Sequence, residues 1–266
     1  MNNLKPVSAL RAHSLLAAAL LLLLSLASTG VPAQTGAARS PTETVREFYR
    51  MMRERHFREA FALSIYRPAI EGLSAEEFEE LRPDFEKMAK NIPEKIEING
   101  EQMSGDTATV FVKIADVDST GQAEPVTLMR DGSAWVVGDR ENQEVVRKSG
   151  KRFFFEARIE THHSEVQEVL QRINLAQLAY ASQHNKLYAD LPTLINSGLV
   201  PKDIETTDST GYRFHLALGK DARSWTAGAE PASYGRTGRL SFFMDQTGIR
   251  SADTGGKPLI LPPGAK

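Results

Sequence analysis

The sequence predicts an α+β protein of two domains, each with helices packed on an antiparallel sheet. Two observations support this fold class. Amphipathic helical patterns come first and alternating strand patterns follow, and the same order appears a second time along the chain. Helices and strands that occur in separate blocks are typical of α+β proteins, whereas α/β proteins alternate the two. Each half is long enough to bury its own apolar core.

The chain opens with the pattern of an export signal. Two basic residues precede an apolar run of 15 residues, Ser14–Ser28, and the small residues Val31 and Ala33 stand where a signal peptidase reads. The run is shorter than the roughly 20 residues that a spanning helix needs. We therefore expect residues 1–33 to be a signal peptide cleaved before Gln34, which leaves 233 of the 266 residues. The alternative is that this segment stays uncleaved and anchors the protein in a membrane.

The composition excludes several classes of function. The chain has no cysteine, so disulfides, thiol catalysis, cysteine-ligated zinc and iron–sulfur clusters are excluded. The formal net charge is −2. Residues 41–140 contain 13 Lys and Arg against 20 Asp and Glu, and residues 141–266 contain 16 against 14. Neither part is basic enough to predict a nucleic-acid partner.

The first domain, residues 41–140, is predicted to begin with a helix. Residues 34–40 form a linker of small residues, and Pro41 suits the first helical position. Ser40 is the expected N-cap, and Glu43, three residues later, completes a capping box. The apolar face of this helix repeats at helical spacing: Val45, Phe48, Tyr49 and Met52.

A second capping box, Ser74 with Glu77, predicts another helix. Its apolar face contains Phe78, Leu81, Phe85 and Met88. Pro83 lies within this pattern and is expected to bend or split the helix, because proline lacks an N–H and its ring clashes with the preceding turn.

Strand patterns follow these helices. "KIEINGEQM" alternates Ile96 and Ile98 with polar residues, and "TATVFVKIADV" places Val110 and Val112 on one face. "EPVTLMRDGSAWVVGD" predicts two strands joined at Asp131–Gly132, because Asp-Gly between apolar runs is a hairpin signal.

Residues 42–139 resemble the NTF2-like (cystatin-like) class of domains. The likeness lies in a helix of the type "VREFYRMM…HFREAFAL" followed by strands that end in "LMRDGSAWVVGD". It implies a curved antiparallel sheet wrapped on helices, often with a cavity, and Trp135 packed under the helix. Tyr49 and Asp139 are the candidate polar groups of such a cavity. His56 stands among charged neighbours and is expected to be exposed.

Residues 141–160 are predicted to connect the two domains. Two interpretations stay open for this segment. It forms either a short helix followed by a strand through Phe153–Phe155, or the early turns of the next helix. Gly150 favours a break within it.

The second domain, residues 161–253, is predicted to start with a long helix. Its apolar stripe contains Val166, Val169, Leu170, Ile173, Ala176 and Tyr180. Leu175, Leu178 and Ala179 widen the stripe, so we expect this helix to be covered on more than one side. A short helix closed by Gly198 follows. Three successive antiparallel strands come last, in "GYRFHLALG", "SWTAGAEP" and "GRLSFFMDQTGIRSAD".

The last two of these strands flank the candidate interaction surface. Their residues expected between sheet and helix are Trp225, Leu240, Phe242 and Met244. The connection "ASYGRTG" is expected to be exposed, and its Tyr234 and Arg236 are candidate interaction residues, because these residue types are favoured at interfaces. Gly248 is expected to take a positive φ in a turn. Residues 254–266 are expected to form a flexible tail.

Residues 164–253 resemble the soluble head of type IV pilins and type II secretion pseudopilins. The likeness rests on "INLAQLAYASQHNKLYADLPTLINSGLV", "GYRFHLAL" and "SWTAGAEPASYGRTGRLSFFMDQTGIR", which give a long helix, a segment ending in Gly-Leu, and a sheet in the family's order. The helix before the head, however, is amphipathic and lies mid-chain, and the leader lacks a Gly-Phe junction. The resemblance therefore implies the fold of the head and not a filament.

The histidines do not have the spacing of a metal site. His162 and His163 are adjacent, so on a helix their side chains point about 100° apart and do not form the i, i+4 pair that grips zinc. His184 and His215 would have to join them through the tertiary fold. We therefore interpret these histidines as surface residues and expect no metal ion.

Asp245 and Asp253 flank a turn, and the resemblance to pseudopilin heads raises calcium as an alternative to a simple capped turn.

The sequence contains no nucleophile elbow, phosphate-binding glycine loop or Ser/His/Asp grouping. We expect no catalytic residues and no cofactor.

These observations predict an exported, non-catalytic binding or scaffolding protein, periplasmic or extracellular, whose partner is another protein of the cell envelope. Two alternatives stay open. The first domain binds a small ligand, or performs weak acid–base chemistry, in an NTF2-like cavity. Otherwise, the protein is an accessory component of a pilus or a type II secretion-like apparatus, which requires an uncleaved N-terminus.

Overall fold

The computed structural model describes residues 39–90, 92, 94–114, 123–208 and 210–260. Two four-stranded antiparallel sheets with helices confirm the predicted α+β class. The chain divides into two compact units, Met1–Phe154 (unit 1) and Phe155–Lys266 (unit 2). The predicted signal peptide, residues 1–33, and most of the predicted linker lie outside the described residues. Among the helices that are described, none has the length and apolarity to cross a bilayer.

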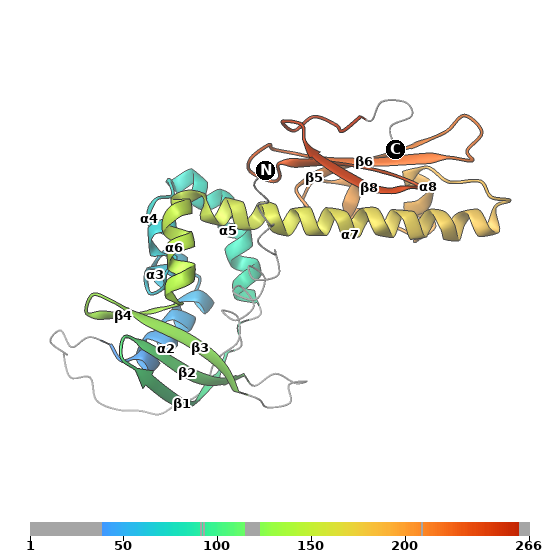
Figure 1. Ribbon diagram of the computed structural model, residues 1–266. Coiled ribbons are helices and arrows are strands. Elements are labelled where there is room, and N and C mark those ends of the chain that lie inside the picture. Colours follow the sequence, from blue (N-terminus) through green and yellow to red (C-terminus); the bar gives the residue numbers. More distant parts are fainter. Residues whose placement is uncertain (1–38, 91, 93, 115–122, 209, 261–266) are drawn as a thin grey trace, which may run out of the picture. The chain divides into compact units, whose positions relative to one another are not determined.

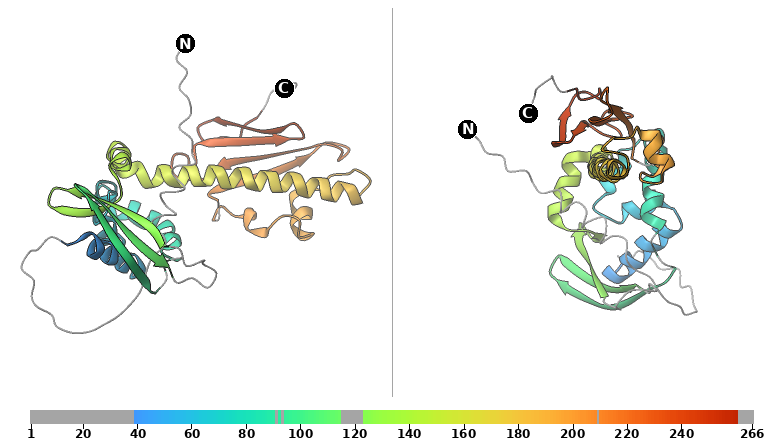
Figure 2. Two further views of the ribbon diagram at one scale, coloured as in Figure 1. Left: turned by 60° about the horizontal axis from the view of Figure 1, so that its bottom comes forward. Right: turned by 90° about the vertical axis from the view of Figure 1, so that its right-hand side faces the viewer.

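Unit 1 contains helices, an antiparallel sheet and a further helix (Figure 1). Its elements are α2 (Pro41–Arg53), α3 (Phe57–Ala62), α4 (Arg67–Glu71), α5 (Ala75–Lys90), β1 (Ile96–Ser104), β2 (Thr107–Ile114), β3 (Ala123–Asp131), β4 (Ala134–Val137), α6 (Arg140–Ser149) and the 3-10 turn η1 (Gly150–Arg152). Each strand pairs with its neighbours in sequence, in the order β1-β2-β3-β4. Figure 2 shows α2 along one face of this sheet, and it contacts β1, β2 and β4.

The predicted helix starts are confirmed by their hydrogen bonds. Ser40 N donates to Glu43 Oε2 (2.8 Å) and Glu43 N donates to Ser40 Oγ (3.2 Å), which is a complete capping box. The same reciprocal pair joins Ser74 and Glu77 at the start of α5 (3.0 and 3.1 Å). Both caps satisfy backbone N–H groups that have no partner inside the helix.

The core of unit 1 lies between the sheet and these helices. The predicted face of α2 is buried, and Tyr49 is 0% exposed. Val110 and Val112 of β2 are buried, as the strand pattern predicts. Asp131 pairs with Ala134 across the predicted hairpin, where Gly132 has φ 63°. Trp135 is buried, and the Arg130 guanidinium lies 4.7 Å from its ring centroid.

Of the two expected effects of Pro83, a bend or a split of its helix, the split is wrong. α5 continues through it from Ala75 to Lys90. Pro83 is exposed, whereas Leu81 and Phe85 on either side of it are buried in the core. The free energy gained by burying these two side chains, about 1.5–3 kcal/mol each, exceeds the free energy lost with the hydrogen bond that proline cannot make.

The segment predicted as a connector is helical throughout, and the strand interpretation of Phe153–Phe155 is wrong. α6 ends at Ser149, its C-cap Gly150 has φ 50°, and α7 (Phe153–Gln183) starts after one 3-10 turn. The boundary between the two units falls within α7, after Phe154. Phe154 belongs to the aromatic core of unit 1, with its ring centroid 5.1 Å from that of Phe61 and 5.0 Å from that of Phe85.

Unit 2 is built on α7, which runs beside a second antiparallel sheet (Figure 1). Its further elements are α8 (Leu191–Asn196), the 3-10 turn η2 (Lys202–Glu205), β5 (Tyr212–Leu218), β6 (Trp225–Pro231), β7 (Leu240–Asp245) and β8 (Gly248–Asp253). The sheet has four strands where the sequence predicted three, because the chain forms β8 after the predicted turn. Gly248 takes a positive φ of 132° in that turn, as predicted.

The core of unit 2 confirms most of the predicted positions and corrects two. Trp225, Phe242 and Met244 are buried against α7, and Leu240 packs at the edge of this core. Leu175 and Leu178 are 65% and 54% exposed, so α7 is not covered on the side where they lie. Both leucines lie on the solvent-facing side of the helix, whereas Ala176, which lies between them in sequence, is buried in the core.

The predicted tail begins in an ordered turn. Ser241 Oγ of β7 donates to Lys257 O (2.7 Å), and Gly255 N donates to Asp253 Oδ1 (3.0 Å). Thr254 also donates to both Ser241 and Lys257. Hydrogen bonds therefore hold residues 254–257 against β7, so the expectation of a flexible tail is wrong for these four residues.

Candidate functional site

The loop between β6 and β7, residues 232–239, contains the predicted connection "ASYGRTG" and is a compact turn with its own hydrogen bonds. Ser233 N donates to Thr237 Oγ1 (3.0 Å), and Thr237 N donates to Ser233 O (2.9 Å). Gly235 N donates to Gly238 O (2.8 Å). Gly235 has φ 71°, a conformation that glycine adopts without strain. The loop therefore holds its shape through local bonds.

The two candidate residues of this loop have different surroundings. The ring of Tyr234 is exposed, and its hydroxyl donates to both carboxylate oxygens of Asp253 (3.0 and 2.9 Å). This hydrogen bond raises the pKa of Tyr234. The guanidinium of Arg236 lies 4.4 Å from the ring centroid of Phe155. The structure thus presents Tyr234 to solvent and holds Arg236 against α7.

The adjacent histidines of α7 hold the far end of the loop. His162 Nδ1 lies 2.8 Å from Thr237 O, so this nitrogen carries the proton and donates. His163 Nε2 accepts from Arg239 N (3.2 Å) and Leu240 N (3.3 Å), so this nitrogen carries no proton. Arg239 also pairs with Glu156 at 2.6 Å. Sequence reasoning treated both histidines as surface residues, but His163 is buried.

Burial lowers the pKa of His163, because a charged imidazolium loses its hydration there. The carboxylate of Glu160, 4.0 Å from Nδ1, opposes this effect, while the charges of His162 and Arg239 add to it. A neutral His163 is the form that can accept the two backbone N–H groups. The loop anchor therefore depends on the protonation state of this residue.

The residues considered for metal binding have separate local roles. His184 stacks on Tyr180, with ring centroids 3.8 Å apart, and His215 Nδ1 lies 3.2 Å from Glu230 Oε2. Asp245 accepts from Thr247 N (2.7 Å), which is the capped turn weighed against calcium, and Asp253 holds Tyr234. Within residues 39–260 as described, no three His, Asp or Glu side chains form a group that would hold a metal ion.

Tyr49 and Asp139 are not placed together as the polar groups of one cavity. Tyr49 is fully buried in the core, which raises its pKa, and its charged neighbour is Glu124. Asp139 is the N-cap of α6, where it accepts from Asn142 N (2.9 Å) and Asn142 Nδ2 (2.5 Å). Burial raises the pKa of Tyr66 to about 12, with a contribution from the charge of Asp139.

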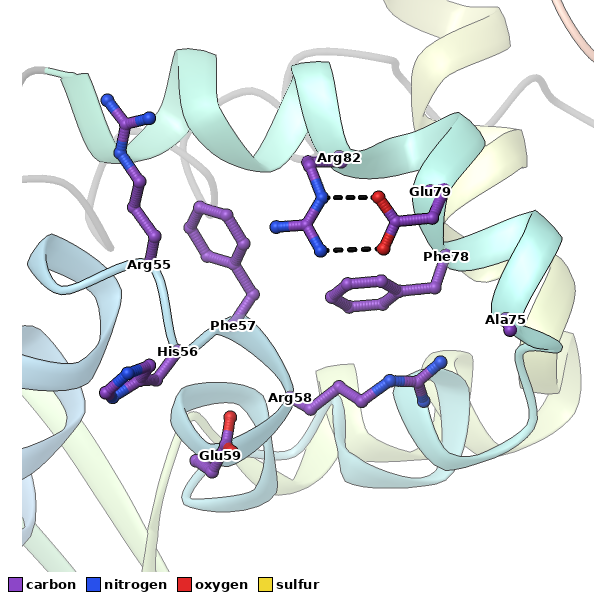
Figure 3. A pocket seen from close by; sticks show the side chains of 9 residues that line it. All are labelled: Arg55, His56, Phe57, Arg58, Glu59, Ala75, Phe78, Glu79 and Arg82. Atoms are coloured by element: carbon purple, nitrogen blue, oxygen red, sulfur yellow. Dashed lines mark hydrogen bonds and ion pairs between the residues drawn. The ribbon is translucent and has the colours of Figure 1, made fainter.

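A cleft of about 350 Å³ lies in unit 1, where the start of α3 meets α5 (Figure 3). Arg82 Nε and Nη2 donate to the two carboxylate oxygens of Glu79 (2.6 and 2.7 Å). Arg58 and Arg82 both lie over the ring of Phe78, with their guanidinium carbons 4.3 and 5.1 Å from its centroid. Arg55, at the other end of the cleft, has φ 63°.

Sequence reasoning missed this cleft, because it considered His56 only as an exposed residue and the helix after Ser74 only through its apolar face. His56 is exposed, as expected. A signal was present in α5: Arg82 follows Phe78 by four residues, and side chains at this spacing are neighbours on a helix. The contribution of Arg58 depends on how α3 packs against α5, which no local pattern reveals.

The chain matches no protein-family model, no curated protein and no solved structure. The resemblances to NTF2-like domains and to pilin heads therefore stay predictions.

Proposed function

We propose that the protein is an exported, non-catalytic binding or scaffolding protein of the periplasm or cell envelope, and that loop 232–239 contacts its protein partner. The exposed Tyr234 ring on an internally braced loop is the observation that carries this proposal. The export part rests on the predicted signal peptide.

The anchoring of the loop supports a role in binding. Contacts from Asp253, Phe155, His162 and His163 hold it in one conformation before any partner arrives. A surface that is already ordered loses less conformational entropy on binding, and tyrosine adds a large contact area with few rotatable bonds. The loop therefore meets two requirements of an interface: an aromatic residue and a preformed backbone.

The packing of unit 1 favours a surface role over a ligand in an NTF2-like cavity. Val110, Val112 and Leu128 of the sheet are 0% exposed, and so is Tyr49 of α2. These side chains occupy the space between sheet and helix in which the family resemblance would place a ligand. The candidate polar groups are used for packing and for capping a helix.

Site-specific photo-crosslinking in the envelope tests this proposal. A photoreactive phenylalanine analogue replaces Tyr234 in the full chain, and the same analogue at exposed Gln171 on α7 is the control. We expect a discrete adduct with one envelope protein from position 234 and not from position 171. Equal adduct patterns from both positions, or no adduct from position 234, would contradict the proposed binding surface.

A matched pair of substitutions separates the ring from the hydroxyl. Tyr234→Phe keeps the ring and loses the bond to Asp253, whereas Tyr234→Ala loses both. We expect Tyr234→Ala to weaken capture of the crosslinked partner far more than Tyr234→Phe. Mass spectrometry of the mature chain checks export: a chain that starts at Gln34 supports it, and a retained leader would favour the accessory-component alternative.

A further inference from the structure

We propose that the cleft between α3 and α5 binds a small organic carboxylate, with Arg58 and Arg82 as the binding residues. This inference goes beyond the proposed function, because it concerns unit 1 and a small molecule. It is independent of loop 232–239.

Arg58 is a cation held in place before a ligand arrives. Its Nη1 donates to Ile70 O (3.1 Å) and its Nη2 to Ser74 O (3.4 Å). Its guanidinium carbon also lies 4.3 Å from the centroid of the Phe78 ring. Among the described residues no carboxylate lies within ion-pair distance of Arg58. A guanidinium has five N–H donors, so donors are left for a ligand.

Arg82 provides a second set of donors, on the other side of the Phe78 ring from Arg58 (Figure 3). Its Nε and Nη2 are used by Glu79, while Figure 3 shows its third nitrogen pointing away from Glu79. The hydrogen bonds from Arg82 lower the pKa of Glu79, and the charge of Arg58 contributes to this shift. Glu79 pairs with Arg82 and not with Arg58, so the guanidinium of Arg58 has no ion-pair partner among the described residues.

Size and shape favour an organic carboxylate over a bare inorganic ion. The volume of about 350 Å³ lies in the range of small-molecule sites, which starts near 300 Å³. Phe57 and Phe78 line the cleft together with the arginines, so a ligand meets an apolar wall as well as charge. The planar fork of arginine matches a planar carboxylate through two parallel hydrogen bonds, as the Arg82–Glu79 pair demonstrates.

Isothermal titration calorimetry of the full mature chain at low ionic strength tests this inference, with succinate as the probe and inorganic phosphate as the comparison. We expect saturable binding of succinate that is tighter than that of phosphate. Arg58→Gln should weaken it about tenfold or more, because a hydrogen bond to a charged group is lost. Glu79→Gln should tighten it, because the substitution releases the fork of Arg82.

The exposed pair Arg67–Glu71 (2.8 Å), which lies outside the cleft lining, supplies matched controls. Arg67→Gln and Glu71→Gln change the net charge by the same amounts and should leave succinate binding unchanged. Arg58→Lys keeps the charge and loses the fork, so it should bind less tightly than the native chain. Circular dichroism confirms that each variant is folded.

Several results would overturn the inference. They are the absence of saturable succinate binding, equal effects of Arg58→Gln and Arg67→Gln, or a Glu79→Gln variant that binds no more tightly. Phosphate binding as tight as succinate binding would also contradict it, since a bare anion would then suffice. If Arg58→Gln does not fold, Arg58→Lys and Glu79→Gln still decide the question.

Discussion

Gln177 is the polar side chain on which the packing of unit 2 depends most directly. It is 0% exposed within α7, and its amide makes two hydrogen bonds to the backbone of Ala189. Gln177 Nε2 donates to Ala189 O (2.7 Å), and Ala189 N donates to Gln177 Oε1 (3.0 Å). Because Ala189 is itself buried, water does not replace these bonds. The loop after α7 is thereby tied to the helix.

The Gln177→Ala substitution should cost about 2 to 6 kcal/mol of unfolding free energy. It leaves one N–H and one C=O of Ala189 buried without a partner, and each such group costs about 1–3 kcal/mol. For a domain of this size 1 kcal/mol shifts the melting temperature by about 4–8 °C, so the transition of unit 2 should fall by about 10 °C or more. Exposed Gln171 on the same helix is the matched control, and Gln171→Ala should stay within about 0.5 kcal/mol.

Each unit carries one of the chain's two tryptophans, which allows the two transitions to be measured separately. Trp225 lies in the core of unit 2 and Trp135 in unit 1. In a Trp135→Phe background, fluorescence during urea unfolding reports on unit 2 alone. A loss for Gln177→Ala no larger than that for Gln171→Ala would refute the reasoning.

A second variant tests the direction of the hydrogen bonds. Gln177→Glu keeps an acceptor for Ala189 N but places a carboxylate oxygen against Ala189 O. It should therefore be destabilised at neutral pH. Its stability should recover as the pH falls, because the protonated carboxyl can donate to Ala189 O.

Three further predictions concern other positions. Unit 2 should lose stability as the pH falls below about 6.5, because burial lowers the pKa of His163 in the folded chain and the unfolded chain therefore binds the proton more readily. Urea titrations from about pH 5 to 8 should show the free energy of unfolding falling with pH, and His163→Gln should flatten this dependence. Gly238→Ala should destabilise unit 2 by about 1–3 kcal/mol in thermal unfolding, because the added Cβ would overlap Tyr212 Oη. An unchanged melting temperature would contradict the close packing of Tyr212 on Gly238. Ser40→Ala should cost unit 1 about 1 kcal/mol, measured by Trp135 fluorescence in a Trp225→Phe background, and no loss would mean that the cap adds nothing.

The parts of the fold that sequence predicts correctly are those set by local chemistry. A capping box needs two residues three positions apart, and a tight hairpin needs a residue that accepts positive φ, so Ser40, Ser74 and Gly132 could be interpreted without the rest of the chain. The buried faces of α2 and β2 follow from periodicity for the same reason. These signals hold because no distant segment has to be known.

The errors occur where tertiary packing decides. The three consecutive phenylalanines that begin α7 show no period, and whether they form a strand or a helix depends on the aromatic core that Phe154 enters. Leu175 and Leu178 widen the apolar stripe of α7, yet periodicity does not tell which side of a wide stripe a neighbouring element covers. The cleft requires Arg58 and Phe78, twenty positions apart, to come together through the packing of two helices.

The spacing of His162 and His163 argues against an i, i+4 zinc pair, but it does not predict the hydrogen bonds that the two rings make. Neighbouring side chains on a helix diverge by about 100°, so His162 and His163 do not grip one ion as an i, i+4 pair does. Because of this divergence, His162 faces the carbonyl of Thr237, while His163 faces two backbone N–H groups at the start of β7. The nitrogen of His162 that faces the loop must carry a proton in order to donate, whereas the nitrogen of His163 that faces the loop must carry none in order to accept. A lysine or arginine could replace the donor, but neither has an acceptor for the N–H groups of Arg239 and Leu240. The second position therefore needs a neutral acceptor of this length, and the stability of the loop is linked to pH through that requirement.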